Sequence, residues 1–203
     1  MRRLAAAALI LACCGVKTLA LGAAEDPDER LTKTYHLDAM RTLEIRGQID
    51  FELVPADGKT VEITVETTRA LFDQLNVSNW WGWGTVSIES GLMGPRERGA
   101  VKVKIAVPPL EQLTVADHSH GTGTWPGTAG KLVVTDFSSA ELAFTGTSLN
   151  LETSWLSAVT LTGKADHLDA LIRYSSHFDA SAFSAGEKTV TADKTSESKT
   201  APE

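Results

Sequence analysis

The sequence predicts an all-β protein in which an N-terminal β-hairpin layer leads into a single-stranded parallel β-helix with coils of about 19 residues. Three observations support this prediction. A period of about 19 residues runs without a gap through the C-terminal half, apolar or small residues recur two positions apart within each row, and no segment has the pattern of a long helix. The recurring columns are Leu113, Leu132, Leu151, Ala170; Val115, Val134, Thr153, Ile172; Ser119, Ser138, Ser157, Ser176; and Gly123, Leu142, Leu161, Ala180.

The first predicted strands follow a charged segment. Residues 25–39 indicate a linker leading into the domain, and the domain itself is predicted over residues 40–190. Apolar residues alternate with polar ones from Leu43 to Leu53, and again from Val61 to Val65 after the turn signal Ala56-Asp57-Gly58-Lys59. This pattern predicts a β-hairpin.

The middle of the chain is expected to continue as strands and turns. Asn79-Trp80-Trp81-Gly82-Trp83-Gly84 is a glycine-punctuated turn, and a short strand follows it at residues 86–88. Alternation from Val101 to Val107 predicts another strand, which Pro108 and Pro109 end.

Each 19-residue row is too short for a pair of helices and suits about three short strands joined by tight corners. Successive coils would lie about 4.8 Å apart, so each column becomes a ladder of stacked side chains. The serine column fits an inward corner, where a small side chain can bond to nearby backbone. Residues 191–203 are rich in Thr, Ser, Lys and Glu and are predicted to be a disordered polar tail.

Residues 1–24 have the layout of a secretory signal peptide. A basic start, Arg2 and Arg3, precedes an apolar stretch too short for a membrane span, and small residues end it at Ala24. Cleavage after Ala24 leaves a mature chain without cysteine and without a transmembrane segment. The alternative is lipidation at Cys13, which follows a loose lipobox. The protein is therefore expected to be exported, to the periplasm or the bacterial outer surface, either free or lipid-anchored.

The charge balance argues against nucleic acid as a partner. Without Arg2, Arg3 and Lys17, the 19 basic residues fall to 16 against 26 acidic residues, a net charge of −10. A chain this acidic, with no basic run, is poorly suited to phosphate backbones or to anionic lipid surfaces. No cofactor is predicted, and the oligomeric state is left open.

The order of segments also resembles a known family. The residues concerned are Gly47-Gln48-Ile49-Asp50-Phe51-Glu52-Leu53, Thr85-Val86-Ser87-Ile88, Ile105-Ala106-Val107-Pro108-Pro109-Leu110-Glu111-Gln112-Leu113, and the small-residue rows that follow. Over about residues 40–190 the chain resembles the domain of unknown function 2807, the auto-transporter adhesin head GIN domain family. The resemblance implies an exported β-helical domain of the bacterial envelope, and it supplies no catalytic residues.

Acidic and histidine residues raise two site hypotheses that the pattern supports weakly. His118 and His120 would share a strand face, but the stacked Phe137 and Ser139 make a poor metal shell, so no metal site is predicted. Asp117 and Asp136 would stack as a carboxylate pair, as in polysaccharide-cleaving β-helices. They define the alternative that the protein is an enzyme, although no catalytic residue is predicted in the leading interpretation.

Aromatic residues give the candidate ligand-binding sites. Trp155 and Tyr174 continue the column of Asp117 and Asp136, and would form an aromatic strip for a sugar or a partner if the column faces outward; if it faces inward they are core. The three indoles of the turn, at positions 80, 81 and 83, would form a binding patch if exposed, or a cap over the open end of the β-helix.

The leading hypothesis is a non-catalytic, adhesin-like binding module of the envelope that uses Trp80, Trp81, Trp83, Trp155 and Tyr174, with carbohydrate or an envelope protein as partner. Two alternatives remain: an enzyme acting on polysaccharide, and a structural module whose coil edges stack between protomers.

Overall fold

The computed structural model describes residues 26–88 and 100–201, and within these ranges the protein is all-β, with one short helix, α1 (Arg69–Phe72). None of the helices in these ranges is long and apolar enough to cross a membrane. The strands are β1 (Arg30–Leu37), β2 (Thr42–Arg46), β3 (Asp50–Pro55), β4 (Val61–Thr68), β5 (Leu75–Trp80), β6 (Trp83–Ile88), β7 (Lys102–Val107), β8 (Gln112–Ala116), β9 (His120–Thr124), β10 (Ala129–Val134), β11 (Ser139–Thr145), β12 (Ser148–Thr153), β13 (Ala158–Ile172), β14 (His177–Ala192) and β15 (Glu197–Thr200).

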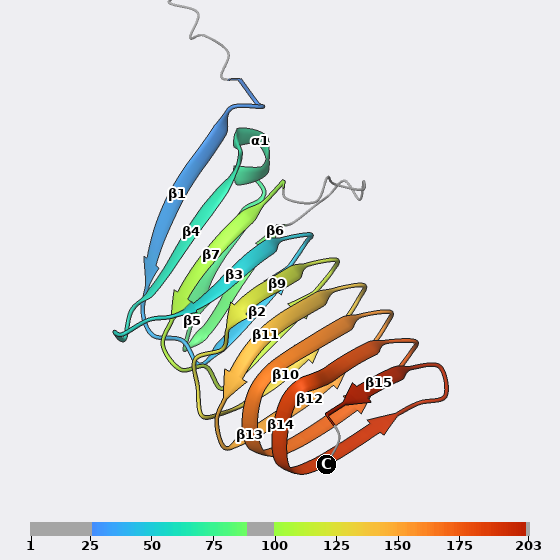
Figure 1. Ribbon diagram of the computed structural model, residues 1–203. Coiled ribbons are helices and arrows are strands. Elements are labelled where there is room, and N and C mark those ends of the chain that lie inside the picture. Colours follow the sequence, from blue (N-terminus) through green and yellow to red (C-terminus); the bar gives the residue numbers. More distant parts are fainter. Residues whose placement is uncertain (1–25, 89–99, 202–203) are drawn as a thin grey trace, which may run out of the picture.

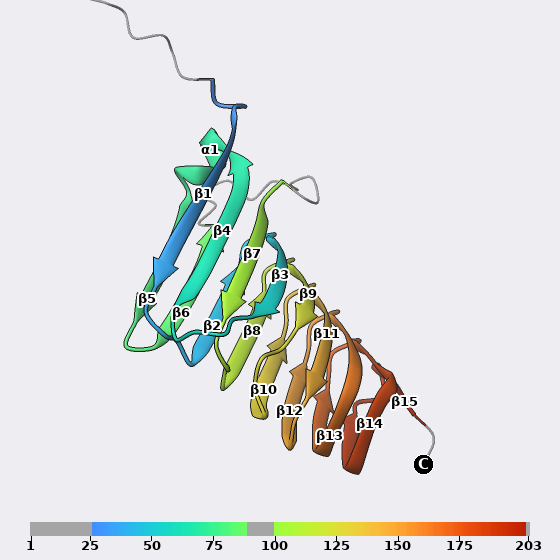
Figure 2. The same ribbon diagram turned by 60° about the vertical axis from the view of Figure 1, so that its left-hand side comes forward.

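The described strands form one sheet that folds back on itself around the core (Figures 1 and 2). One face contains β3, β9, β11 and the first part of β13, and the other contains β2, β8, β10 and β12. The two faces are continuous through β13, which pairs with β11 along its first part and with β12 along its second. The all-β prediction is therefore confirmed.

Parallel pairing follows the period of the sequence. Leu132 lies beside Leu113 and Leu151, and Leu151 lies beside Ala170. The same spacing of 19 residues separates the serines that bond across neighbouring rows. The spacing increases to 20 residues at the C-terminal end, where Ser176 bonds to Ser196 after an irregularity between Thr160 and Thr162.

The predicted hairpin at the N-terminus is wrong. β3 and β4 are consecutive but not neighbours, because β7 lies between them, parallel to β3 and antiparallel to β4. The turn signal at residues 56–59 marks a chain reversal, but such a signal does not specify which strands become neighbours. Residues 42–55 instead form a first row, in which Leu43 pairs with Leu113 and Asp50 with His120.

Strands also occur in the segment predicted as a linker and domain entry and in the segment predicted as a disordered tail. β1 lies within the predicted linker 25–39 and pairs antiparallel with β4 along its whole length. β15 lies within the predicted disordered tail 191–203 and pairs in parallel with β14. Both predictions rested on polar composition, yet backbone hydrogen bonds of a sheet edge do not require apolar side chains. The predicted leader 1–24 and Cys13 lie outside the described residues.

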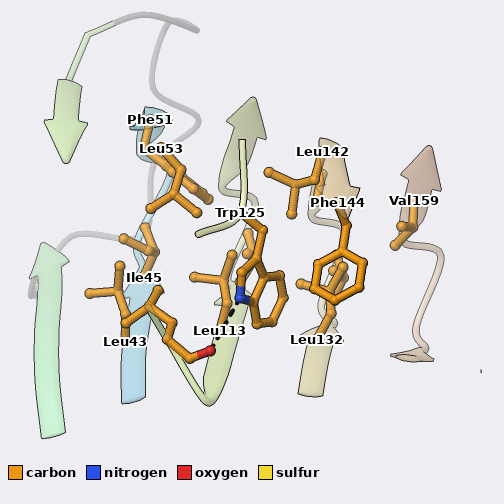
Figure 3. Close-up of a cluster of buried hydrophobic side chains, with 14 of the residues drawn as sticks. Leu43, Ile45, Phe51, Leu53, Leu113, Trp125, Leu132, Leu142, Phe144 and Val159 are labelled. Carbon is orange, nitrogen blue, oxygen red and sulfur yellow. Dashed lines mark hydrogen bonds between the residues drawn. The ribbon is translucent and has the colours of Figure 1, made fainter. Parts of the chain in front are cut away.

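The core is a stack of inward side chains from both faces. Leu113, Leu132 and Leu151 are at most 3% exposed, and Val134 and Val115 lie beside them in the next inward column. Figure 3 shows how leucines of the two faces meet, with the buried indole of Trp125 between them. Nε1 of Trp125 donates to the Leu110 carbonyl (3.3 Å). Packing of these buried side chains fixes the strands, and the strands in turn fix the corners that carry the exposed residues described next.

Candidate binding surfaces

The corners between the two faces have an unusual backbone. In four successive rows, two consecutive non-glycine residues have a positive φ, for example 57° at Trp155 and 58° at Leu156. The pairs are Asp117–His118, Asp136–Phe137, Trp155–Leu156 and Tyr174–Ser175. Such a conformation costs on the order of 1 kcal/mol per residue. Backbone bonds between rows compensate for it: the amides of His118, Phe137 and Leu156 donate to the carbonyls of Asp136, Trp155 and Tyr174 at 2.9–3.0 Å.

The serine column holds the corners from inside. The amide of Ser119 donates to Oγ of Ser138 (3.2 Å), Ser138 to Ser157 (3.3 Å), and Ser157 to Ser176 (3.3 Å). All four serines are buried. The prediction that this column faces inward and bonds to backbone is confirmed, and its physical role is to satisfy amides that would otherwise be buried without a partner.

The left-handed pair turns two successive side chains outward, which creates an exposed strip along the corners. We call His118, Phe137, Trp155, Leu156 and Tyr174 the corner strip. Phe137, Trp155, Leu156 and Tyr174 are between 49% and 57% exposed. The rings stack along the strip: Trp155 and Tyr174 are 4.4 Å apart and 18° from parallel, and His118 and Phe137 are 5.1 Å apart and 11° from parallel. The predicted aromatic ladder is present, and its alternative placement in the core is wrong.

The charges along the strip are unevenly distributed. Asp117 and Asp136 lie at its first rungs, and Asp117 also contacts Arg46 (Oδ2 to Nη1, 3.5 Å). Arg173 and Lys194 are exposed at its last rungs. Both ends of the strip therefore carry an acid and a base, Asp117 with Arg46 at one end and Asp193 with Lys194 at the other, while its middle rungs are apolar.

Asp193 and Thr195 accept backbone bonds at the last corner, where the Ser175 amide donates to the Thr195 hydroxyl (3.0 Å). Oδ2 of Asp193 accepts the Tyr174 amide at 2.7 Å, and its Oδ1 accepts the amide and hydroxyl of Thr195. The bond from the Tyr174 amide, with those from Ser196 and Thr195, lowers the pKa of Asp193 from 3.8 to about 2. A carboxylate with a depressed pKa stabilises the folded state above its unfolded pKa, and this stabilisation is lost as the pH falls through the folded pKa.

We therefore expect the last row to loosen between about pH 4 and pH 2, while Asp193→Asn removes this component of the pH dependence. Hydrogen exchange of the Tyr174 amide, measured across this pH range, checks the prediction. Asp57→Asn, in the connection between β3 and β4, is the control for loss of one negative charge. Equal exchange of Tyr174 in the wild type and in Asp193→Asn at every pH would contradict the role given to Asp193.

A second exposed surface is formed by the turn between β5 and β6. Trp81 (φ 55°) and Gly82 (φ 81°) are its two central residues, the pattern of a type I′ hairpin turn. Asn79 Nδ2 donates to the Asp38 carbonyl (2.7 Å), and the Arg41 amide donates to the Gly82 carbonyl (2.8 Å), so the turn is fixed to the sheet. We call Trp80, Trp81 and Trp83 the Trp hairpin.

The indoles of the Trp hairpin are exposed. Trp81 is 93% exposed, Trp80 76% and Trp83 51%, so they do not form the cap considered from the sequence. Trp80 and Trp83 are directly opposite each other in the pairing. Among the described residues, none of the three indoles stacks on another ring. Their faces are therefore open to a ligand.

The sheet around the hairpin separates its two faces clearly. Gly84 lies beside Met40, which is buried and occupies the space where a larger side chain at position 84 would go. On the outer face, the neighbours of Trp83 and Trp80 in the register are Thr42, Thr85 and Ser78. The indoles are thus bordered by hydroxyl groups.

The structure places the two aromatic groups at opposite edges of one face of the sheet, the Trp hairpin between β5 and β6 and the corners after β8, β10, β12 and β13. Trp83 is level with Thr42, the first residue of β2, whereas the corners follow Ala116, which is level with Arg46, the last residue of β2. Because Thr42 and Arg46 are the two ends of a five-residue strand, these levels lie roughly 13 Å apart along the strand direction. The predicted set of ligand-binding residues therefore forms two surfaces. Phe137 and Leu156 were not predicted as binding residues, because strand alternation places only one of two successive residues on the outer face, whereas the left-handed corners expose both.

The histidines do not form a metal site in the described ranges, where no group of three potential ligands is found. His118 lies in a corner and His120 in β9, so the expectation that they share a strand face is wrong. His120 Nδ1 shares a hydrogen bond with Ser139 Oγ (2.6 Å). The left-handed pair between the two faces breaks the strand alternation on which the expectation rested.

Comparison with solved structures shows the same fold in bacterial proteins. The chain is similar to a "putative adhesin" of Parabacteroides merdae (13% identity, TM-score 0.60, covering 84% of this chain and 80% of that one). It is also similar to a "putative adhesin" of Parabacteroides distasonis (17% identity, TM-score 0.57, covering 81% of this chain and 78% of that one). A third similar structure is a "putative lipid binding protein" of Parabacteroides distasonis (15% identity, TM-score 0.55, covering 80% of this chain and 78% of that one).

No relative was found among curated proteins. Residues 40–201 match the family described as "Putative auto-transporter adhesin, head GIN domain", which covers more than half of the chain. This confirms the resemblance read from the strand order and the small-residue rows. The protein belongs to the auto-transporter adhesin head GIN domain family.

Proposed function

We propose that the protein is a non-catalytic binding module of the bacterial envelope that recognises carbohydrate through the Trp hairpin. The observation that carries this proposal is the exposure of three unstacked indoles on a turn held rigidly to the sheet. Export is part of the proposal and is supported by the leader-like residues 1–24 and by membership of an adhesin family.

Carbohydrate is favoured by the chemistry around the hairpin. A sugar ring presents C–H groups to an aromatic face and hydroxyl groups at its rim, so it needs an open ring face with hydrogen-bonding groups beside it. Trp81 supplies an open face, and Thr42, Thr85 and Ser78 supply neighbouring hydroxyls. Glu44, next to Thr85 in the register, is already paired with Arg46 (Nε to Oε1, 2.6 Å), so the hydroxyl groups are the polar partners that the sheet offers. A fixed turn also lowers the entropy lost on binding.

The corner strip is less suitable for a sugar. Trp155 and Tyr174 cover one face of each other, so the pair presents mainly ring edges to solvent. A role for these two residues in ligand binding stays a prediction, and it would be a separate site from the Trp hairpin.

The enzymatic alternative, with Asp117 and Asp136 as a carboxylate pair, has less support. Asp117 contacts Arg46, and stacked aromatic rings occupy the following rungs where a glycan substrate would continue. Binding of a glycan without cleavage would argue against it. The structural alternative, with stacking between coil edges, requires assemblies that grow from the ends of the sheet.

The architecture behind this proposal is a parallel β-helix with coils of about 19 residues. Its support is the parallel register of β8, β10 and β12 on one face and of β9, β11 and β13 on the other. Such a scaffold keeps an exposed turn at a fixed position, which is what a surface-binding module requires.

The test is a glycan array probed with the wild-type protein and with Trp80→Ala/Trp81→Ala/Trp83→Ala. If each indole contributes about 1 kcal/mol, the triple variant loses about a hundredfold in affinity for any glycan bound by the wild type. Trp155→Ala, a loss of one indole at the opposite edge, is the matched control and should bind normally. Circular dichroism confirms that each variant is folded.

Two outcomes would overturn the proposal. One is that the wild type binds no glycan but binds phosphatidylcholine vesicles through the same indoles, which would make the hairpin a lipid-contacting element. The other is that glycan binding persists in the triple variant and is lost in Trp155→Ala, which would move the site to the corner strip.

A further inference from the structure

A row of polar side chains leads away from the Trp hairpin across the outer face of the sheet. The strands β6, β2, β8, β10, β12 and β13 lie side by side in that order (Figure 2). The register aligns Trp83 with one residue from each of the other five strands, and these residues, which we call the polar track, are Thr42, Gln112, Lys131, Asn150 and Asp169. In each strand the next residue is buried in the core, so the polar track faces outward.

The far half of the polar track borders a hollow of about 230 Å³ in the outer face. The side chains that line the hollow are Lys131, Asn150, Glu152, Asp169, Leu171 and Thr191. They belong to four neighbouring strands and form two adjacent outward columns, so the hollow runs across the strands and not along them. Its long direction is therefore the direction of the polar track, which leads back to Trp83.

Two polar side chains on this side of the hollow are free to bind a ligand. Asn150 and Asp169 are exposed, and neither side chain forms a hydrogen bond or an ion pair with another described residue. An amide both donates and accepts, and a carboxylate accepts, so the two together match the hydroxyl groups of a sugar. Leu171, which is partly exposed across the hollow, supplies apolar surface for the C–H groups of the same ring.

The charges along the polar track favour a neutral ligand. Nζ of Lys131 pairs with Glu152 (3.6 Å), and nearer to the hairpin Nε of Arg46 pairs with Glu44 (2.6 Å). Among the charged residues that line the hollow, Asp169 alone has no partner of opposite charge in the described ranges. An acidic glycan would bring its own carboxylates close to Asp169 and Glu152, whereas a neutral glycan meets no like charge.

We propose that the Trp hairpin and the polar track together bind a linear, neutral oligosaccharide that lies across the strands. This inference rests on the proposed function, because the hairpin stacks on one sugar ring and the track contacts the units that follow. Exposed polar side chains are ordinarily only solvated; the hollow and its alignment with the indoles distinguish these. Five strand spacings separate Trp83 from Asp169, a distance of about 24 Å, of which a single sugar ring covers only a fraction. The affinity should therefore rise with the number of sugar units.

The experiment is calorimetric titration of the wild-type protein with neutral linear glycans of two to six units from the cello-, manno- and chito-oligosaccharide series. In a series that the protein binds, the hexasaccharide should bind at least about tenfold more tightly than the disaccharide, because it gains the hydrogen bonds of the track. Oligogalacturonate of six units, with a carboxylate on every ring, should bind more weakly than the neutral hexasaccharide.

A double substitution tests the polar track itself. Asn150→Ala/Asp169→Ala should lose about tenfold in affinity for the hexasaccharide and less than about twofold for the disaccharide, which is held by the hairpin. The matched control is Glu141→Ala/Thr160→Ala, which removes two exposed side chains from neighbouring strands on the opposite outer face. It should bind both glycans as the wild type does, and circular dichroism confirms that both variants are folded.

The outcomes separate this inference from the proposed function. Absence of binding to every series would overturn both. Binding that is lost in Trp80→Ala/Trp81→Ala/Trp83→Ala but is equally tight for disaccharide and hexasaccharide would overturn the polar track alone, as would full hexasaccharide affinity in Asn150→Ala/Asp169→Ala. Tighter binding of oligogalacturonate than of the neutral hexasaccharide would overturn the assignment of a neutral ligand.

Discussion

Replacing Leu132 with alanine is expected to reduce the free energy of unfolding by about 2–5 kcal/mol. Leu132 is fully buried and lies between Leu113 and Leu151 in the parallel register. Backbone bonds hold the neighbouring strands at a fixed spacing, so the cavity left by the missing side chain cannot close by movement of one strand. The penalty should therefore lie toward the upper end of this range.

Leu156→Ala is the matched control for this change. The same atoms are removed, but Leu156 is 57% exposed on a corner, so we expect a loss of no more than about 0.5 kcal/mol. Urea denaturation of both variants gives the comparison. Similar losses in the two variants would mean that Leu132 is not in a rigid core.

Gly163→Ala is the second change with a large expected effect. Gly163 has a φ of 104°, and a Cβ there would collide with the backbone carbonyl of Phe144 in the neighbouring strand. A carbonyl held in a sheet cannot move aside as a flexible side chain can. Because the backbone strain and the collision act together, we expect a loss of about 3 kcal/mol or more.

Gly58→Ala is the control for adding one methyl group to a glycine. A Cβ at Gly58 would meet only Thr60, at 3.7 Å, and its φ lies outside the left-handed region. Its stability should change little, and should rise slightly if the unfolded chain loses freedom. Thermal unfolding of the two variants and the wild type measures these differences in stability. A stable Gly163→Ala protein would show that the sheet can shift at this position.

The rows were predictable from sequence because the register repeats a chemical pattern. Leucines in register with leucines, and serines in register with serines, both appear as columns at a fixed spacing. The position of Trp155 and Tyr174 was not predictable in the same way. Strict alternation from Val115 places Asp117 and its column inward, but the left-handed corner turns two successive residues outward and breaks the alternation.

The N-terminal region was mispredicted for a different reason. Residues 42–55 form a row, but the residues that pair with them are 70 positions away, as between Ile49 and Ser119. A separation of that size is not a multiple of the repeat, so no periodicity reveals it. The exposure of the Trp hairpin could have been anticipated from the dipeptide Trp81-Gly82, since a two-residue turn leaves no room to bury its own tip.

The repeat in the register has a consequence for how the molecule can change in size. A one-residue slip in a strand moves core side chains to solvent, so this part of the chain can lengthen or shorten only by whole rows, which have 19 residues, or 20 where an irregularity takes up one extra residue. Each inserted row would extend the corner strip by one step of about 4.8 Å and leave the Trp hairpin unaltered. The reach of one surface is thus adjustable in discrete increments, while the shape of the other stays constant.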